Sequence, residues 1–377
     1  MNLADMLTYA DIQDLNRIAS TYDCECNSHS KNDLIQSILS TVNRKDVFEQ
    51  QIADLSLEEV RFLNSLLFDT KALFSLEELT ARARQAKFEK EDSDNFNPRD
   101  LIVRFKKLGW LFHGHSPQTK YLFQVPNDLK KRFCDVLGRR MLERLQWTKD
   151  PVVYREEHRL IVEDIHKFLK FVGSNDVILA ADGTIYKRTL AAALEELSVR
   201  EANVSKGGWR FGYGRMFKDY PNRFSLIYDY CYFHALIRET DGRLQLTDIG
   251  TERILLNQKE LIQDVYKFWL RLYKGPIPNL EALVQWMERL TKDWVDVSSL
   301  KEVLCPLISP FYYDQAESIF DFRLTQMMLH LGLLSIGETE QGKQVVRLSR
   351  VGSFIIRGIQ VKDDEVIKWP NHISDPR

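Results

Sequence analysis

Hydrophobic positions in residues 320–358 repeat first with helical and then with strand spacing. The apolar residues between positions 322 and 331 keep a near-helical spacing, and Gly332 predicts the end of that helix. Two alternating hydrophobic segments follow, at 333–336 and 345–348, with a polar turn between them. The stretch therefore predicts a helix, a two-stranded hairpin and a final helix that begins after a Ser-x-x-Gly sequence.

The same order of elements occurs twice more, in residues 222–255 and 99–129. In these stretches the helix ends at Ala235 or Gly109, and a hydrophobic pair, a polar turn and an alternating strand follow. Helix, small residue and two-stranded ribbon is the outline of a winged helix. A single copy could be any helix followed by a hairpin, but three copies favour a repeated unit.

The middle copy also ends with Thr247-x-x-Gly250, whereas the first copy has Pro126 and Asp128 at this place. We predict a mainly α-helical protein with short β-wings, in which tandem winged-helix domains follow a small helical module. The expected divisions are a helical module at 1–43, winged-helix domains at 46–150, 151–258 and 259–358, and a polar tail at 359–377.

Composition describes a globular chain of 377 residues, 44% hydrophobic and 28% charged. A formal net charge of −2 argues against a protein that coats nucleic acid with its whole surface, so any such binding is local. No apolar run reaches the ~18 residues that a membrane span needs, and the N-terminus lacks a signal-peptide pattern. The five cysteines do not resemble a disulfide framework. We expect a cytoplasmic protein with reduced thiols and no membrane association.

Charge changes sharply between two neighbouring segments. Residues 46–95 carry 6 basic and 12 acidic residues, whereas residues 99–147 carry 11 basic and 4 acidic ones. The helix that Pro98 opens has an inward apolar stripe, which predicts a recognition helix with basic residues facing outward. These cations are Arg99, Arg104, Lys106 and Lys107. The alternative is that the basic segment pairs with the acidic one inside the chain.

Residues 27–39, NSHSKNDLIQSIL, resemble the second half of SAP and Rho N-terminal domains, which commonly bind nucleic acid. The resemblance implies that Lys31 is a basic contact. The alternative is a helical hairpin that packs on the next domain and leaves Lys31 in solvent.

Residues 177–197 hold an apolar strand, a glycine turn, a short strand and Lys187-Arg188 before a helix. This segment and the wing sequences resemble the helicase-associated, XPB N-terminal-like domain family, over about residues 46–256. The resemblance implies tandem winged helices that accompany DNA helicases or nucleases. The helicase core itself is missing, because the chain has no G-x-x-x-x-G-K-[ST] phosphate loop.

Residues 200–224 interleave glycines with basic and aromatic residues, a composition suited to phosphates and unpaired bases. The candidate contacts are Lys206, Trp209, Arg210, Tyr213, Arg215, Lys218 and Arg223. The alternative is that the aromatic rings cover a core and the arginines stay in solvent. Gly212-x-Gly214 follows no convincing strand, so we expect no nucleotide cofactor.

No catalytic motif occurs in the chain, and neither Cys24, Cys26 and His29 nor His113 and His115 complete a metal-ligand set. We therefore expect a non-enzymatic DNA-binding accessory protein without a cofactor. It would bind duplex or forked DNA and act beside a separately encoded helicase or nuclease. The competing hypothesis is a protein-interaction adaptor that uses winged helices as docking surfaces and never binds DNA.

Overall fold

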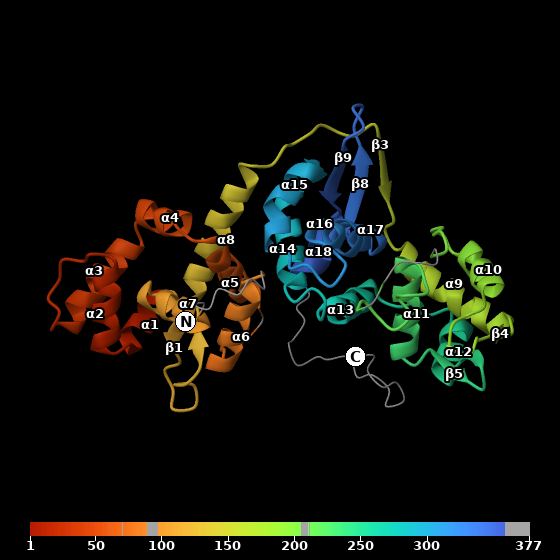
Figure 1. Ribbon diagram of the computed structural model, residues 1–377, viewed down its shortest axis with the longest axis horizontal. Coiled ribbons are helices and arrows are strands. Elements are labelled where there is room, and N and C mark those ends of the chain that lie inside the picture. Colours follow the sequence, from red (N-terminus) through yellow and green to blue (C-terminus); the bar gives the residue numbers. More distant parts are fainter. Residues whose placement is uncertain (70, 89–96, 205–209, 211, 359–377) are drawn as a thin grey trace. The chain divides into compact units, whose positions relative to one another are not determined.

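The computed structural model describes residues 1–69, 71–88, 97–204, 210 and 212–358 (Figure 1). The chain divides into two compact units, Met1–Arg144 and Leu145–Arg377. As predicted, the described parts are mainly α-helical with short antiparallel sheets. No helix in these parts is long and apolar enough to cross a membrane.

The first unit consists of eight helices and one short hairpin within its described residues. Serine capping boxes start α5 and α6, and Pro98 opens α7 as the sequence predicted. Trp110 is fully buried at the centre, with ring contacts to Phe48, Phe105 and Phe133. The elements are α1 (Leu3–Tyr9), α2 (Ile12–Thr21), α3 (Lys31–Val42), α4 (Lys45–Ala53), α5 (Leu57–Leu67), α6 (Leu76–Ala86), α7 (Pro98–Lys107), β1 (Phe112–His113), β2 (Phe123–Gln124) and α8 (Asn127–Leu142).

The second unit contains two sets of helices, each with its own sheet (Figure 1). The first set is α9 (Leu160–Ser174), β4 (Val177–Ile178), α10 (Lys187–Glu196), α11 (Asn222–Phe233), β5 (Ile237–Thr240), β6 (Arg243–Leu246) and α12 (Asp248–Leu255). The second set is α13 (Ile262–Tyr273), α14 (Leu280–Leu290), β7 (Val295–Asp296), α15 (Val297–Leu304), η1 (Cys305–Leu307), α16 (Ala316–Ser318), the π-helix η2 (Ile319–Thr325), α17 (Gln326–His330), β8 (Leu334–Glu338), β9 (Gln344–Leu348) and α18 (Arg350–Gly358).

One order of elements occurs three times: a helix, a short extended segment, two helices and a hairpin. The copies span α5 to β2, α9 to β6, and α14 to β9. In every copy the short segment pairs antiparallel with the second hairpin strand. The pairs are Phe74 with Phe123, β4 with β6, and β7 with β9.

The third helix of each copy ends in the same backbone turn, as the sequence predicted. Gly109, Ala235 and Gly332 have φ angles of 64°, 52° and 70°. The amide of the following residue then donates to the carbonyl five positions earlier, which is the Schellman arrangement. These bonds join Trp110 to Phe105 at 2.9 Å, Leu236 to Cys231 at 2.8 Å and Leu333 to Met328 at 2.8 Å.

The Ser/Thr-x-x-Gly sequences hold the final helix of the second and third copies against this turn. The Ser349 hydroxyl donates to the Gly332 carbonyl at 2.7 Å and accepts from the Gly352 amide at 2.8 Å. Thr247 makes the same two contacts with Ala235 and Gly250. The first copy differs, because its Asp128 accepts from the Leu3 amide at 2.9 Å and so anchors α1.

Strand β3 (Val153–Glu156) lies in the third copy's sheet, although these residues were predicted to belong to the second domain. It pairs with β8, so the strand order is β3-β8-β9-β7. Trp147 also pairs with Val295 of β7. The chain before the second copy therefore belongs to the third copy's sheet, a pairing that local sequence does not encode.

Candidate nucleic-acid interface

The third helices of the three copies differ in what they expose. All residues of α11 from Arg223 to Cys231 are buried, and the helix packs against α9, α13 and α17. In η2 and α17 most side chains are buried as well, and Phe322 is the large hydrophobic residue left exposed. Among the described residues of α7, α11, η2 and α17, only α7 has charged side chains that are exposed to solvent. The second and third copies thus use their third helices for packing.

Helix α7 has one buried and one exposed face. Leu101, Ile102 and Phe105 are buried, whereas Arg99, Val103 and Lys107 are exposed. A spacing of four residues places these three exposed side chains on one face of a helix. Val103 is 47% exposed, so apolar surface lies between the two cations.

Arg104 lies next to this stripe and forms an ion pair with Glu59 of α5. Its side chain is still 49% exposed, whereas the Glu59 side chain is 9% exposed. The guanidinium has five donor groups, so one carboxylate leaves donors for an external anion. Asp100 is also exposed on this side, where the Asn97 side chain donates to its carboxylate at 3.1 Å.

Lys106 points toward α2 and the hairpin, so the prediction that it faces outward is only partly right. Its ammonium lies 3.9 Å from the Asp14 carboxylate and 3.2 Å from Nε2 of His113. Burial and the charge of Lys106 hold the pKa of His113 below its usual range. The neutral ring can therefore accept a hydrogen bond from Lys106.

Some cations of the basic segment at 99–147 form contacts with the acidic segment at 46–95 inside the first unit. Besides Arg104 with Glu59, Arg139 pairs with Glu49 at 2.7 Å. Arg140 donates to the Ile52 carbonyl at 3.1 Å. These contacts support the intramolecular alternative for several of the cations. Arg99 and Lys107 have no ion pair among the residues that the structure describes.

The N-terminal helices pack on the first copy, as the alternative to the SAP-like prediction expected. The Tyr22 hydroxyl donates to the Leu108 carbonyl at 2.8 Å, and Ile18 lies against Gly109. Lys31 is exposed in the first turn of α3, after the Ser30 cap. It is accessible, but the contacts around it do not join it to α7.

In the second unit, Lys187 and Arg188 are exposed in the first turn of α10. Lys218 is exposed as well. These three side chains remain available to a ligand. Of these three, only Lys218 belongs to the glycine-aromatic segment at 200–224, and the other candidate residues of that segment lie in several different environments.

Lys206 and Trp209 lie outside the described residues. Tyr213 is 2% exposed and packs against Tyr273 at 4.9 Å and Phe217 at 5.0 Å between ring centroids. It therefore cannot stack on a base, and the alternative that this ring covers a core is correct for Tyr213. The prediction was wrong because a glycine-rich segment can also fold onto a neighbouring helix.

The arginines of this segment have partners within the chain. Arg210 donates to the Tyr220 carbonyl at 3.2 Å and lies 4.4 Å from the Phe217 ring centroid. Arg215 forms a bidentate ion pair with Glu239. The Arg215 side chain is 9% exposed and Arg210 is partly buried, so their charges serve internal contacts first.

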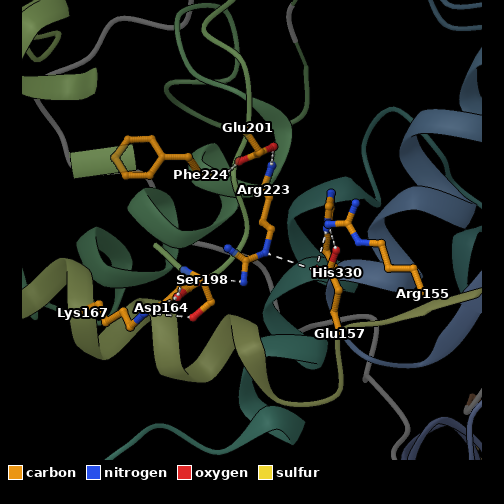
Figure 2. Close-up of polar contacts among 9 residues, drawn as sticks. All are labelled: Arg155, Glu157, Asp164, Lys167, Ser198, Glu201, Arg223, Phe224 and His330. Carbon is orange, nitrogen blue, oxygen red and sulfur yellow. Dashed lines mark hydrogen bonds and ion pairs between the residues drawn. The ribbon is translucent and has the colours of Figure 1, made fainter. Parts of the chain in front are cut away.

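Arg223 is fully buried, so the prediction that it contacts DNA is wrong. Its Nη2 lies 2.7 Å from Oδ2 of Asp164, and its Nε lies 3.5 Å from Oε2 of Glu157 (Figure 2). Nδ1 of His330 from α17 donates to the same Glu157 oxygen at 2.9 Å. The guanidinium thus contacts Asp164 within its own copy, and it is linked to the third copy through Glu157, which also contacts His330.

The ionisation of Glu157 follows from these contacts. Burial acts to raise the pKa of this carboxyl, but the His330 hydrogen bond and the charges of Arg223 and Arg155 outweigh it. Together they hold the pKa below its usual range. Glu201 holds the start of α11 beside this cluster, because its carboxylate accepts hydrogen bonds from the backbone amides of Arg223 and Phe224 at 2.9 and 2.8 Å.

Within the described ranges, no group of three or more His, Cys, Asp or Glu side chains is arranged to hold a metal ion. Val103 was not among the contacts predicted from the sequence, although its spacing from Arg99 and Lys107 is a readable signal.

Comparison of the chain with protein-family models, with curated proteins and with solved structures finds no match.

Proposed function

We propose that each of the three copies is a winged helix and that the protein is a non-enzymatic DNA-binding accessory protein. Its duplex contact is the exposed face of α7. The repeated order of elements, the pairing of each short segment with the second hairpin strand and the common helix-ending turn support the fold assignment.

The observation that carries the functional proposal is the exposed stripe of Arg99, Val103 and Lys107 on α7. An α-helix fits the major groove of B-DNA, where cations at its edges meet phosphates and apolar side chains meet base edges. Two cations without a described ion pair are available for that role, and the half-exposed Arg104 adds a third. A local site of this size agrees with a net charge of −2.

The packed third helices in the second unit favour a second candidate function. Helices α11 and α17 occupy the position that α7 has in the first copy, and they are buried against other helices of the chain. Two copies therefore already act as docking modules within the chain. An adaptor that binds proteins and not DNA would use α7 in the same way. The wider hypothesis, action beside a helicase or nuclease, rests on the sequence resemblance.

The experiment measures how tightly the full chain binds a labelled blunt DNA duplex, with fluorescence anisotropy as the readout. Arg99→Ala/Lys107→Ala removes two proposed phosphate contacts, and we expect affinity to fall on the order of tenfold per contact near 0.1 M salt. Lys187→Ala/Arg188→Ala is the matched control, since it removes two exposed cations from α10. Equal losses in the two variants would refute the assignment to α7. If the wild-type protein does not bind DNA at low salt, the adaptor function stands instead.

A further inference from the structure

Three exposed rings lie on the hairpin of the first copy or beside it. Tyr121 is 74% exposed and Tyr9 is 63% exposed, and His115 is exposed as well. The rings of Tyr9 and His115 have centroids 5.1 Å apart and planes inclined by 34°. We call Tyr9, His115 and Tyr121 the wing platform.

The hairpin itself brings the members of the platform together. The Gly114 amide donates to the Leu122 carbonyl at 2.9 Å. His115 and Tyr121 are the next residues beyond this bond on the two arms of the hairpin. Tyr9 comes from the last turn of α1 and reaches His115 from outside the hairpin.

Lys106, at the edge of the exposed face of α7, links this helix to the hairpin that carries His115 and Tyr121. Lys106 of α7 contacts His113 at 3.2 Å, and His113 precedes His115 by two residues on the same arm. Lys120 adds a second cation, because its ammonium lies 4.7 Å from the centroid of the Tyr121 ring. A cation therefore lies beside a ring at two places on the hairpin, Lys106 at His113 and Lys120 at Tyr121.

Large rings in water contribute little to folding, whereas they are well suited to stack on a planar ligand. Bases inside a duplex are already stacked on one another, but unpaired bases have free faces. Aromatic side chains beside cations bind single strands, because the rings stack on bases while the cations attract phosphates. The chemistry of the wing platform thus matches a single strand better than a duplex.

We infer that the wing platform binds unpaired bases of a single-stranded DNA arm that adjoins a duplex held on α7. This inference rests on the proposed function and adds the class of substrate, a junction between duplex and single strand. Tyr121 and the Tyr9–His115 pair supply the stacking surfaces, and Lys120 attracts the backbone of the arm.

The test compares the full chain on two labelled DNAs: a blunt duplex, and the same duplex with an unpaired oligothymidine arm. The wild-type protein should bind the armed duplex more tightly, by roughly 5- to 150-fold for each stacked base. Tyr121→Ala and Tyr9→Ala should reduce this preference and leave affinity for the blunt duplex unchanged. Tyr121→Phe should retain it, because the ring remains. Tyr186→Ala is the matched control, since Tyr186 is 54% exposed in the second unit.

The outcomes separate the two proposals. If the wild-type protein binds both DNAs equally, the inference is overturned while the duplex site on α7 stands. If the alanine variants lose blunt-duplex and armed-duplex binding to the same extent, the rings serve the duplex site and the inference fails. If neither DNA binds, the proposed function fails and the inference falls with it.

Discussion

Replacing Arg223 by methionine is expected to destabilise the second unit strongly and to leave the proposed DNA-binding surface on α7 unaltered. The side chain is fully buried between Asp164 and Glu157, which are 0% and 1% exposed. Methionine keeps much of the side-chain length but removes the buried cation that Asp164 and Glu157 share, while Arg155 and His330 still contact Glu157. Removal of one partner from a buried ion pair costs about 3–5 kcal/mol, a large part of the ~5–15 kcal/mol that stabilises a domain.

Hydrogen exchange measured by mass spectrometry can locate this loss. Amides of α9 and α11 should exchange roughly 150- to 5,000-fold faster in the variant, because 3–5 kcal/mol lowers the free energy of opening by that factor. Peptides from α5 in the first unit provide an internal control. Arg188→Met is the matched variant, since Arg188 is exposed, and it should change exchange by less than about threefold.

Two further observations would check the reasoning. Without Arg223, burial should raise the pKa of Glu157, so the lost stability should return in part as pH falls and the carboxyl takes up a proton. Affinity for DNA should be unchanged at temperatures where the variant is folded. Unchanged exchange together with weakened DNA binding would refute our reasoning and restore Arg223 as a DNA contact.

The remaining predictions concern the repeated turn and one buried acid. Ala235→Gly should stabilise the protein by about 0.5–1 kcal/mol in urea unfolding, because Ala235 has a positive φ where the other copies have glycine. Gly352→Ala should destabilise it by roughly 3 kcal/mol, since the added carbon would lie 2.2 Å from a backbone oxygen, whereas Gly275→Ala meets no atom within 4 Å. Burial raises the pKa of Asp229 to about 7. Its contribution to stability is present below the unfolded pKa of about 3.9 and is lost as pH rises toward 7, and Asp229→Asn should remove this slope.

The helix ends and the repeat could be predicted from the sequence because their signals are local. Glycine or alanine at the turn, serine with glutamate three residues later, and proline at a first helical position each act within a few residues. The burial of Tyr213 and Arg223 depends on partners elsewhere in the chain, such as Tyr273 and Glu157. The burial of α11 did have a readable signal, because apolar residues of this helix occur on all of its faces. This pattern is typical of a buried helix.

The pairing of β3 with β8 could not be read in advance either. Residues 153 and 338 form one end of the pairing, and no short-range pattern links positions so far apart. The intramolecular pairing of Arg104 and Arg139 with acidic helices was foreseen only as an alternative. Charge counts show that a segment is basic, but they do not show which cations already have partners.

The most direct test of the central claim, that α7 holds duplex DNA through Arg99 and Lys107, is the salt dependence of binding. The dissociation constant of the full chain for a blunt duplex should be measured between about 50 and 200 mM salt, for the wild type and for Arg99→Ala/Lys107→Ala. Each phosphate contact contributes about 0.9 to the slope of log K against log salt, so the variant's slope should be smaller by about two units. An unchanged slope in the variant would contradict the claim, because the counterions released on binding would then come from another surface.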